Sequence, residues 1–263
     1  MKKQTKQLKN KIQKQNEGDE RIPVEIIQPW STFVMKTKLP KVVFDKMLEI
    51  TNKIVDNVEN EKSWGHNLAG QIENELYIEH EILHKNGVMQ FFLDMVRHYV
   101  VNQLLQMMPY NQEKILNDEW TTNLMSMWVV SQKEHEYNPM HIHTQCHVSS
   151  VMYLKVPKFS ESRKSHRKDD GSIVFSNNCS LDDYFAVPQI ALEPKVGDMY
   201  IFPAKMAHHV YPFRSDDEDK ERRSVSFNAI YSSKSQMEHM AEMEKKAKEE
   251  NKKSQEAYRS FVQ

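Results

Sequence analysis

The stretch Arg222-Arg223-Ser224-Val225-Ser226-Phe227-Asn228 alternates between two kinds of side chain, and this alternation decides the fold class. A period of two predicts a β-strand, with Val225 and Phe227 on an apolar face. The other face is polar at four consecutive positions, so it either meets solvent or lines a cavity that holds a polar ligand. Arg222 and Ser224 on that face offer a guanidinium fork and a hydroxyl, a pair suited to a carboxylate.

The residues upstream of this strand separate into a helical half and a β half. Apolar residues at three-to-four spacing predict amphipathic helices over 40–60 and 87–109. Short runs rich in β-branched and aromatic residues follow, at 122–131, 147–156, 172–176, 188–193, 198–203, 207–213 and 222–231. Such strands, separated by turn residues, predict a sandwich or jelly roll. The expected fold class is therefore α+β, with N-terminal helices that buttress one face of a double-stranded β core.

Composition excludes several classes of protein. The 263 residues include only 2 Cys and 6 Gly but 12 His. Cys146 and Cys179 form no CxxC pair, which excludes a disulfide scaffold and favours the cytoplasm. No run is long and apolar enough to span a membrane, and no nucleotide-binding glycine loop is present.

The net charge of −1 hides a segregation of charge along the chain. Residues 1–17 hold six lysines and one acid, so we expect residues 1–20 to form a basic, disordered arm. Residues 21–232 form the expected single domain, with helical support at 40–110 and a catalytic β core at 120–231. We expect residues 233–263 to form a charged, solvated helix, which could also dock on the body of the protein or on a second subunit. Beyond the arm, no basic stripe indicates nucleic-acid binding.

Histidines suggest a metal site. His141 and His143 are two residues apart, so in an extended segment their side chains project from one face and can converge on one ion. A further strand begins at His208-His209, and a jelly roll can bring its first residue beside the first two histidines. Three ligands would then leave the other side of the ion open. His209 could replace His208 by a one-residue shift, and either histidine could instead face solvent.

The order and spacing of these motifs resemble a known family. The motifs are Trp128, Asn138, His141-x-His143, Ser149-Ser150-Val151-Met152-Tyr153, Gly197-Asp198, Phe202-Pro203, His208-x-Val210-x-Pro212 and Arg222-x-Ser224-Val225-Ser226-Phe227-Asn228. Over roughly 120–231 the chain resembles the non-haem Fe(II)/2-oxoglutarate oxygenases related to prolyl-4-hydroxylases, in a subgroup with an HxH motif that is common in bacteria and tailed phages. The usual pattern of the superfamily is HxD or HxE, whereas this chain has His143 at the second position.

The resemblance implies a double-stranded β-helix (jelly-roll, cupin-like) core, a function and the roles of individual residues. His141, His143 and His208 would bind Fe(II), and Arg222, assisted by Ser224, would hold the far carboxylate of 2-oxoglutarate. Tyr153 could add a hydrogen bond to 2-oxoglutarate or be a core residue. The implied reaction consumes O2, releases succinate and CO2 and hydroxylates a substrate, either a protein side chain or a small molecule. Apart from the resemblance, the cysteine content gives the cytoplasm as the expected location, of a phage host if the chain is phage-encoded, and docking through the C-terminal helix would give a homodimer.

Two other functions stay open from the sequence. A cupin-like protein could hold zinc on the three histidines and Cys146, although Cys146 has the opposite strand parity and would need a bulge. A non-catalytic β-sandwich could instead act through its basic arm and C-terminal helix. The sequence does not identify a substrate.

Overall fold

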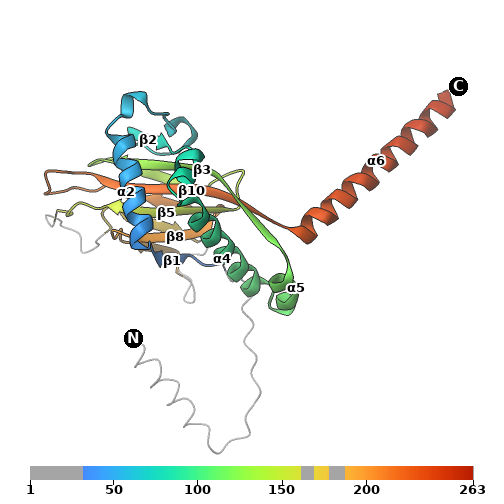
Figure 1. The fold of residues 1–263 in the computed structure, drawn as a ribbon, viewed down its shortest axis with the longest axis horizontal. Coiled ribbons are helices and arrows are strands. Elements are labelled where there is room, and N and C mark those ends of the chain that lie inside the picture. The colour runs from blue at the N-terminus through green and yellow to red at the C-terminus, as the bar shows by residue number, and fades with distance from the viewer. Residues whose placement is uncertain (1–31, 161–168, 178–186, 263) are drawn as a thin grey trace, which may run out of the picture. The chain divides into compact units, whose positions relative to one another are not determined.

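The computed structural model describes residues 32–160, 169–177 and 187–262 (Figure 1). The expected basic arm at 1–20 and Cys179 lie outside these residues. The described chain contains five α-helices, three 3-10 helices and ten strands, and its strands form two antiparallel sheets.

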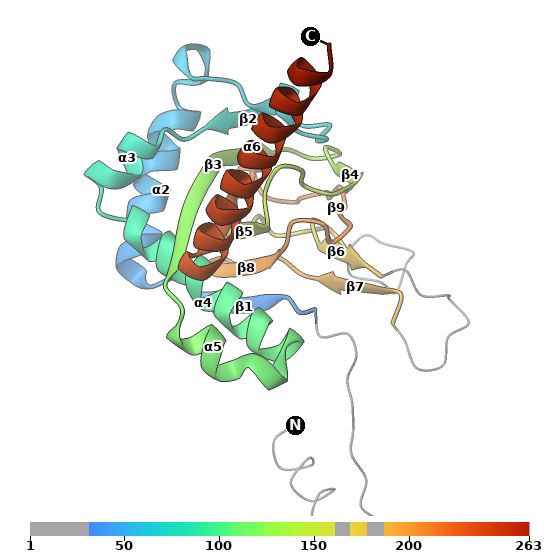
Figure 2. The ribbon, with the colours of Figure 1, turned by 90° about the vertical axis from the view of Figure 1, so that its right-hand side faces the viewer.

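The larger sheet has six strands and forms the centre of the fold. Its order is β1 (Met35–Lys38), β8 (Asp198–Pro203), β5 (Val148–Lys155), β10 (Arg222–Ser233), β3 (Trp120–Gln132) and β2 (Asn74–Tyr77). The smaller sheet has the order β4 (Asn138–His141), β9 (His208–Val210), β6 (Ile173–Ser176) and β7 (Gln189–Leu192). From β3 to β10 the chain crosses repeatedly between the sheets, which lie face to face without closing into a barrel (Figure 2). This confirms the expected jelly roll.

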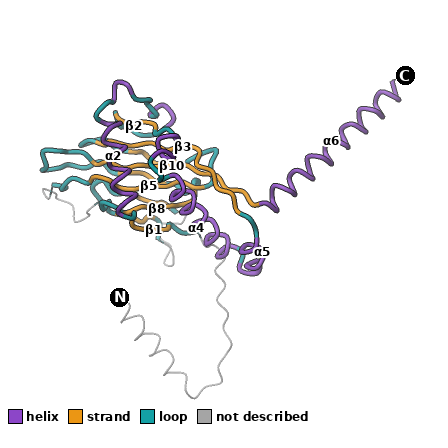
Figure 3. The backbone as a smooth tube through the Cα atoms, in the orientation of Figure 1, coloured by secondary structure: helices purple, strands orange, loops and turns teal. Residues whose placement is uncertain are grey.

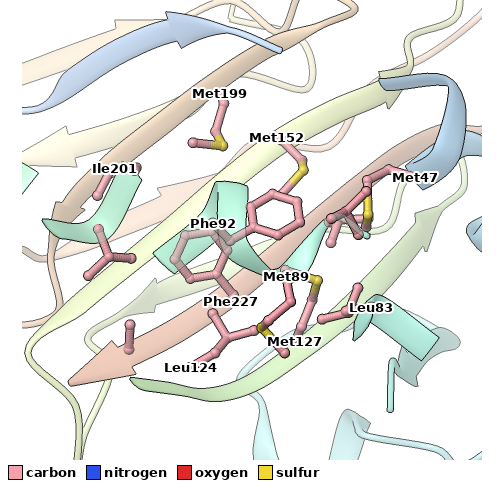
Figure 4. Packing of buried hydrophobic residues seen from close by; sticks show 14 of the residues in the cluster. Met47, Leu83, Met89, Phe92, Leu124, Met127, Met152, Met199, Ile201 and Phe227 are labelled. Atoms are coloured by element: carbon pink, nitrogen blue, oxygen red, sulfur yellow. The ribbon is translucent and has the colours of Figure 1, made fainter. Parts of the chain in front are cut away.

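The α-helices are α2 (Lys41–Val55), α3 (His80–Lys85), α4 (Met89–Met107), α5 (Gln112–Asn117) and α6 (Lys234–Val262), and the 3-10 helices are η1 (Val58–Asn60), η2 (Gly65–Asn67) and η3 (Pro109–Asn111). Of these, α2 and α4 cover the outer face of the six-stranded sheet, as the tube in Figure 3 shows. The apolar stripes of α2 and α4 pack on the sheet, where Met47, Phe92, Met127, Met152 and Phe227 are fully buried (Figure 4). The buttressing role expected of the N-terminal helices is confirmed.

Strand β10 separates the two environments of the sheet. Val225 and Phe227 point into the helical core and are 0% exposed. Arg222, Ser224 and Ser226, which alternate with them, line a cavity between the two sheets. The polar face predicted from the sequence is therefore an interior wall and not a solvent-exposed edge.

The first half of the chain is less helical than expected. Strands β1 and β2 were missed because each has only four residues and carries polar side chains such as Lys36, Lys38 and Asn74. Both are edge strands, and edge strands tolerate such residues. The helix expected over 40–60 ends at Val55, and a turn and η1 follow it.

Two observations concern the surface of the described chain. None of its helices is long and apolar enough to cross a membrane. The helix α6 exposes Met237, Met240 and Met243, each more than half accessible to solvent.

Candidate active site

Three histidines from the smaller sheet converge at one end of the cavity between the sheets. His141 ends β4 and is paired in register with His208, which begins β9. His143 follows β4 by two residues, and its backbone N–H donates to Ala204. One ring nitrogen of each histidine lies within 4.8 Å of the others, and the Nε2 atoms of His143 and His208 are 3.3 Å apart. The structure thus brings together the three histidines singled out from the sequence.

Backbone carbonyl groups orient two of the imidazoles. His141 Nδ1 lies 2.7 Å from the carbonyl oxygen of Pro139, and His208 Nδ1 lies 2.8 Å from that of Met206. In each ring Nδ1–H therefore donates to the carbonyl, so Nε2 keeps its lone pair and points into the cluster. This orientation by outer hydrogen bonds is characteristic of histidines that bind metal ions.

Burial keeps the three imidazoles neutral. Burial, helped by the charge repulsion of neighbouring imidazoles, lowers the pKa of His143 to about 3 and that of His208 to about 4, although the hydrogen bond to Met206 opposes the shift of His208. Burial also lowers the pKa of His141, although the hydrogen bond to Pro139 opposes it. A neutral imidazole is the form that binds a metal ion, so the triad needs no deprotonation near neutral pH.

The other end of the cavity holds a buried cation. Arg222 is 2% exposed, and its Nη1 donates to Gln132 Oε1 at 3.0 Å and to Ser224 Oγ at 3.4 Å. Its guanidinium carbon lies 4.8 Å from the centre of the Tyr153 ring. Its Nε and Nη2 atoms are buried without a hydrogen-bond partner, as is the hydroxyl of Tyr153. Because burial of an unpaired charge is costly, these donors fit a carboxylate ligand that they would bind together.

Gly171 makes room for the arginine. Its φ is +58°, and a Cβ at this position would lie 3.1 Å from Arg222 Cδ and 2.9 Å from the Phe159 ring. A larger residue would therefore be strained and would displace the guanidinium.

Several residues that the sequence did not identify complete the cavity. Gln132 is the cross-strand partner of Arg222, and this register is not visible in the sequence. Leu68, Ala69 and Ile72 from the segment before β2 form another wall. Trp128 was part of the motif without an assigned role, and it lines the cavity with its ring 6.0 Å from that of His143. Asn138 was part of the motif but had no assigned role, and its Oδ1 is buried without a partner beside the cavity.

The alternative ligands from the sequence do not join the three histidines. In the part of the chain that the structure describes, no cysteine or carboxylate belongs to this cluster. Cys146 is buried outside it as a free thiol. His209, the residue after His208, is not part of the cluster, and its ring packs edge-on against the ring of Tyr211.

Comparison with known proteins gives one family match. The family described as "Putative 2OG-Fe(II) oxygenase" matches residues 126–228, a range that contains the three histidines, Tyr153, Arg222 and Ser224. No curated protein matches the sequence.

Several solved structures are similar to parts of this chain. An oxidoreductase of the 2OG-Fe(II) oxygenase family from Burkholderia pseudomallei is 14% identical, over 51% of this chain and 56% of that one, with a TM-score of 0.33. The chain therefore spans little more than half of that protein. A Pseudomonas putida prolyl-4-hydroxylase is 15% identical, over 75% and 93% of the two chains, with a TM-score of 0.41. A Trichoplax adhaerens prolyl hydroxylase, solved with a hypoxia-inducible-factor peptide, is 12% identical, over 75% and 83%, with a TM-score of 0.44.

Proposed function

From the match of residues 126–228 to the 2OG-Fe(II) oxygenase family, we propose a function for this protein. It is an Fe(II)- and 2-oxoglutarate-dependent dioxygenase that hydroxylates its substrate. The observation that carries the proposal is the pairing, in one cavity, of a neutral histidine triad with a buried arginine, two of whose donor atoms, Nε and Nη2, lack a partner. The first suits a divalent metal, and the second suits the carboxylate of a co-substrate.

His141, His143 and His208 are the proposed iron ligands. Imidazole suits Fe(II), and the three nitrogens are close enough to share one ion. Because no carboxylate joins them in the described chain, the triad would leave both positive charges of the metal uncompensated. An anionic co-substrate would therefore be favoured at this site more strongly than at a site with an HxD motif.

Arg222, Ser224 and Tyr153 are the proposed 2-oxoglutarate residues. Arg222 would donate from Nε and Nη2 to the carboxylate farther from the metal, and the Tyr153 hydroxyl could add a third hydrogen bond. Ser224 and Gln132 already accept hydrogen bonds from Nη1, so they orient the guanidinium before the ligand arrives. Burial raises the pKa of Tyr153 to about 12, so its hydroxyl remains a donor at neutral pH.

When bound, Fe(II) supplies the oxidising chemistry that couples O2 and 2-oxoglutarate decarboxylation, with release of succinate and CO2, to hydroxylation of the substrate. The protein contributes position and exclusion of water. The side chains of Val151, Ile173 and Val210 line the cavity with apolar surface, which strengthens the interaction between Arg222 and an anion.

Succinate formation tests this proposal. Purified protein with Fe(II), O2 and 2-oxoglutarate should release succinate slowly even without the true substrate, and Arg222→Met should abolish this turnover at low 2-oxoglutarate concentration. A folded, iron-replete wild-type protein that forms no succinate would contradict the proposal. No observation favours the zinc or non-catalytic alternative over it.

Finer assignments are proposals as well. We propose residues 21–232 as the oxygenase unit, with helical support at 40–110 and a catalytic core at 120–231, and a cytoplasmic location consistent with the low cysteine content. The exposed methionines of α6 support a homodimer as the proposed assembly, which sedimentation of Met240→Glu would test. Nucleic acid is not a proposed partner, since only the lysines of residues 1–20 would suit it.

A further inference from the structure

One wall of the cavity is a segment tied to both sheets. Residues 62–73, which we call the strap, precede β2 and include η2. The strap forms an isolated β-bridge between Ser63 and Leu76 of the six-stranded sheet. It forms another between Gln71 and Tyr137, next to β4 of the smaller sheet, where the Gln71 N–H donates to the Tyr137 carbonyl at 2.8 Å. The strap therefore spans one side of the sandwich.

The strap separates the cavity from a buried acid. Its residues Leu68, Ala69 and Ile72 line the cavity. Glu75 of β2 is the cross-strand partner of Val130, which also lines the cavity, so both side chains project from the same face of the sheet. The Glu75 carboxyl group thus lies one strand beyond the cavity wall, on the inner side of the strap.

The environment of Glu75 is unusual for a carboxyl group. Glu75 is 1% exposed, and neither of its side-chain oxygens has a hydrogen-bond partner. Two strap glycines lie against it: a Cβ on Gly70 would come within 2.6 Å of Oε1, and one on Gly65 within 3.6 Å of Oε2. The carboxyl group occupies space that a side chain at position 70 would fill.

The charges around Glu75 favour a cation. The lysine of the strap, Lys62, does not pair with Glu75. Its Nζ lies instead 4.5 Å from the centre of the Tyr77 ring and 5.7 Å from that of the Trp64 ring. The nearby Glu136 is held by the backbone N–H groups of Glu73 and Lys133 and repels negative charge on Glu75. Burial is the larger effect, and together they raise the pKa of Glu75 to about 7. An unpaired buried carboxyl group is destabilising, so a ligand that pairs with it would be bound strongly.

We propose that Glu75 is the recognition residue for a cationic group of the substrate, a primary amine or a guanidinium, which reaches it when the strap moves away from the cavity. That the bound molecule is a substrate rests on the proposed oxygenase function, whereas the binding of a cation at Glu75 does not. The cation would enter between Val130 and the strap, pair with Glu75, and leave the rest of the molecule in the cavity that also contains the histidine triad.

Binding of small probes to the full chain tests the proposal without catalysis. The probes are n-pentylamine and, as the uncharged control, 1-pentanol, added to metal-free protein at pH 8 and followed by calorimetry. The variants are Glu75→Gln, which keeps the shape but not the charge, and Glu73→Gln, a matched control at an exposed acid of the strap. The amine should bind at least tenfold more weakly to Glu75→Gln than to the wild type and equally well to Glu73→Gln, while 1-pentanol should not distinguish the three proteins.

Hydrogen exchange of the wild type gives a second readout that needs no variant. Exchange of the strap amides, including those of Gly65 and Gly70, should change with n-pentylamine and not with 1-pentanol. Equal amine affinity in the wild type and Glu75→Gln, or an unchanged strap in the amine-saturated wild type, would overturn the proposal. Either result would leave succinate formation from 2-oxoglutarate intact, and loss of succinate formation with amine binding intact would overturn only the oxygenase function.

Discussion

Replacement of Glu75 by glutamine should change how stability depends on pH. The folded protein raises the pKa of this group from 4.5 to about 7, mainly through burial. Between these two values the folded state holds a proton that the unfolded state has released. The stability of the wild type therefore falls as pH rises from 4.5 to 7, and the loss is complete above pH 7.

The size of the effect follows from the two pKa values. A difference of about 2.5 in pKa corresponds to about 3 kcal/mol of unfolding free energy, since each pKa unit is worth about 1.4 kcal/mol. Glutamine cannot ionise, so Glu75→Gln escapes this loss. Relative to the wild type, the variant should gain about 3 kcal/mol between pH 4.5 and pH 8. The histidine contributions cancel in this comparison because both proteins contain the same histidines.

Urea unfolding in EDTA, followed by circular dichroism at pH 4.5, 6 and 8, measures this difference. Glu73→Gln is the matched control, because Glu73 is exposed and its replacement should change stability by less than about 0.5 kcal/mol at each pH. Parallel pH profiles for the wild type and Glu75→Gln would refute the reasoning, since they would mean that Glu75 is hydrated or paired in solution.

Two pairs of neighbouring residues give further expectations. Arg222→Met should weaken 2-oxoglutarate binding about 100-fold in calorimetry, because about 3 kcal/mol of charged hydrogen bonds is lost, while the metal-free protein keeps its thermal stability. Arg223→Met should instead destabilise the fold by about 3 kcal/mol or more, because Arg223 donates to Glu221 at 2.6 and 2.8 Å and its loss leaves a buried acid. His208→Ala should lower metal affinity by more than about 100-fold in a competition titration, whereas His209→Ala should change it little. Equal effects within either pair would contradict the assigned roles.

The sequence predicted the β core well because its patterns are local. Alternation in 222–231 places Arg222 and Phe227 on opposite faces without knowledge of the partner strands. The sequence predicts the three histidines for the same reason. A pair of histidines two residues apart and a histidine at the start of a strand can both be recognised without knowledge of the tertiary structure.

The parts that the sequence missed depend on contacts between distant segments. Glu75 and Gln132 take their roles from cross-strand register with Val130 and Arg222, which no local pattern specifies. The strap is held by two single bridges and has no periodicity of its own. Short polar edge strands such as β1 lack the apolar alternation on which prediction depends.

Anaerobic titration of the apoprotein with Fe(II) and 2-oxoglutarate tests the central claim most directly. If the histidine triad binds iron and Arg222 anchors the co-substrate in the same cavity, a visible charge-transfer band should appear only when both are present. The band should be lost in His208→Ala and should need much more 2-oxoglutarate in Arg222→Met. A folded wild-type protein that binds Fe(II) and 2-oxoglutarate separately but gives no band when both are bound would contradict the shared site.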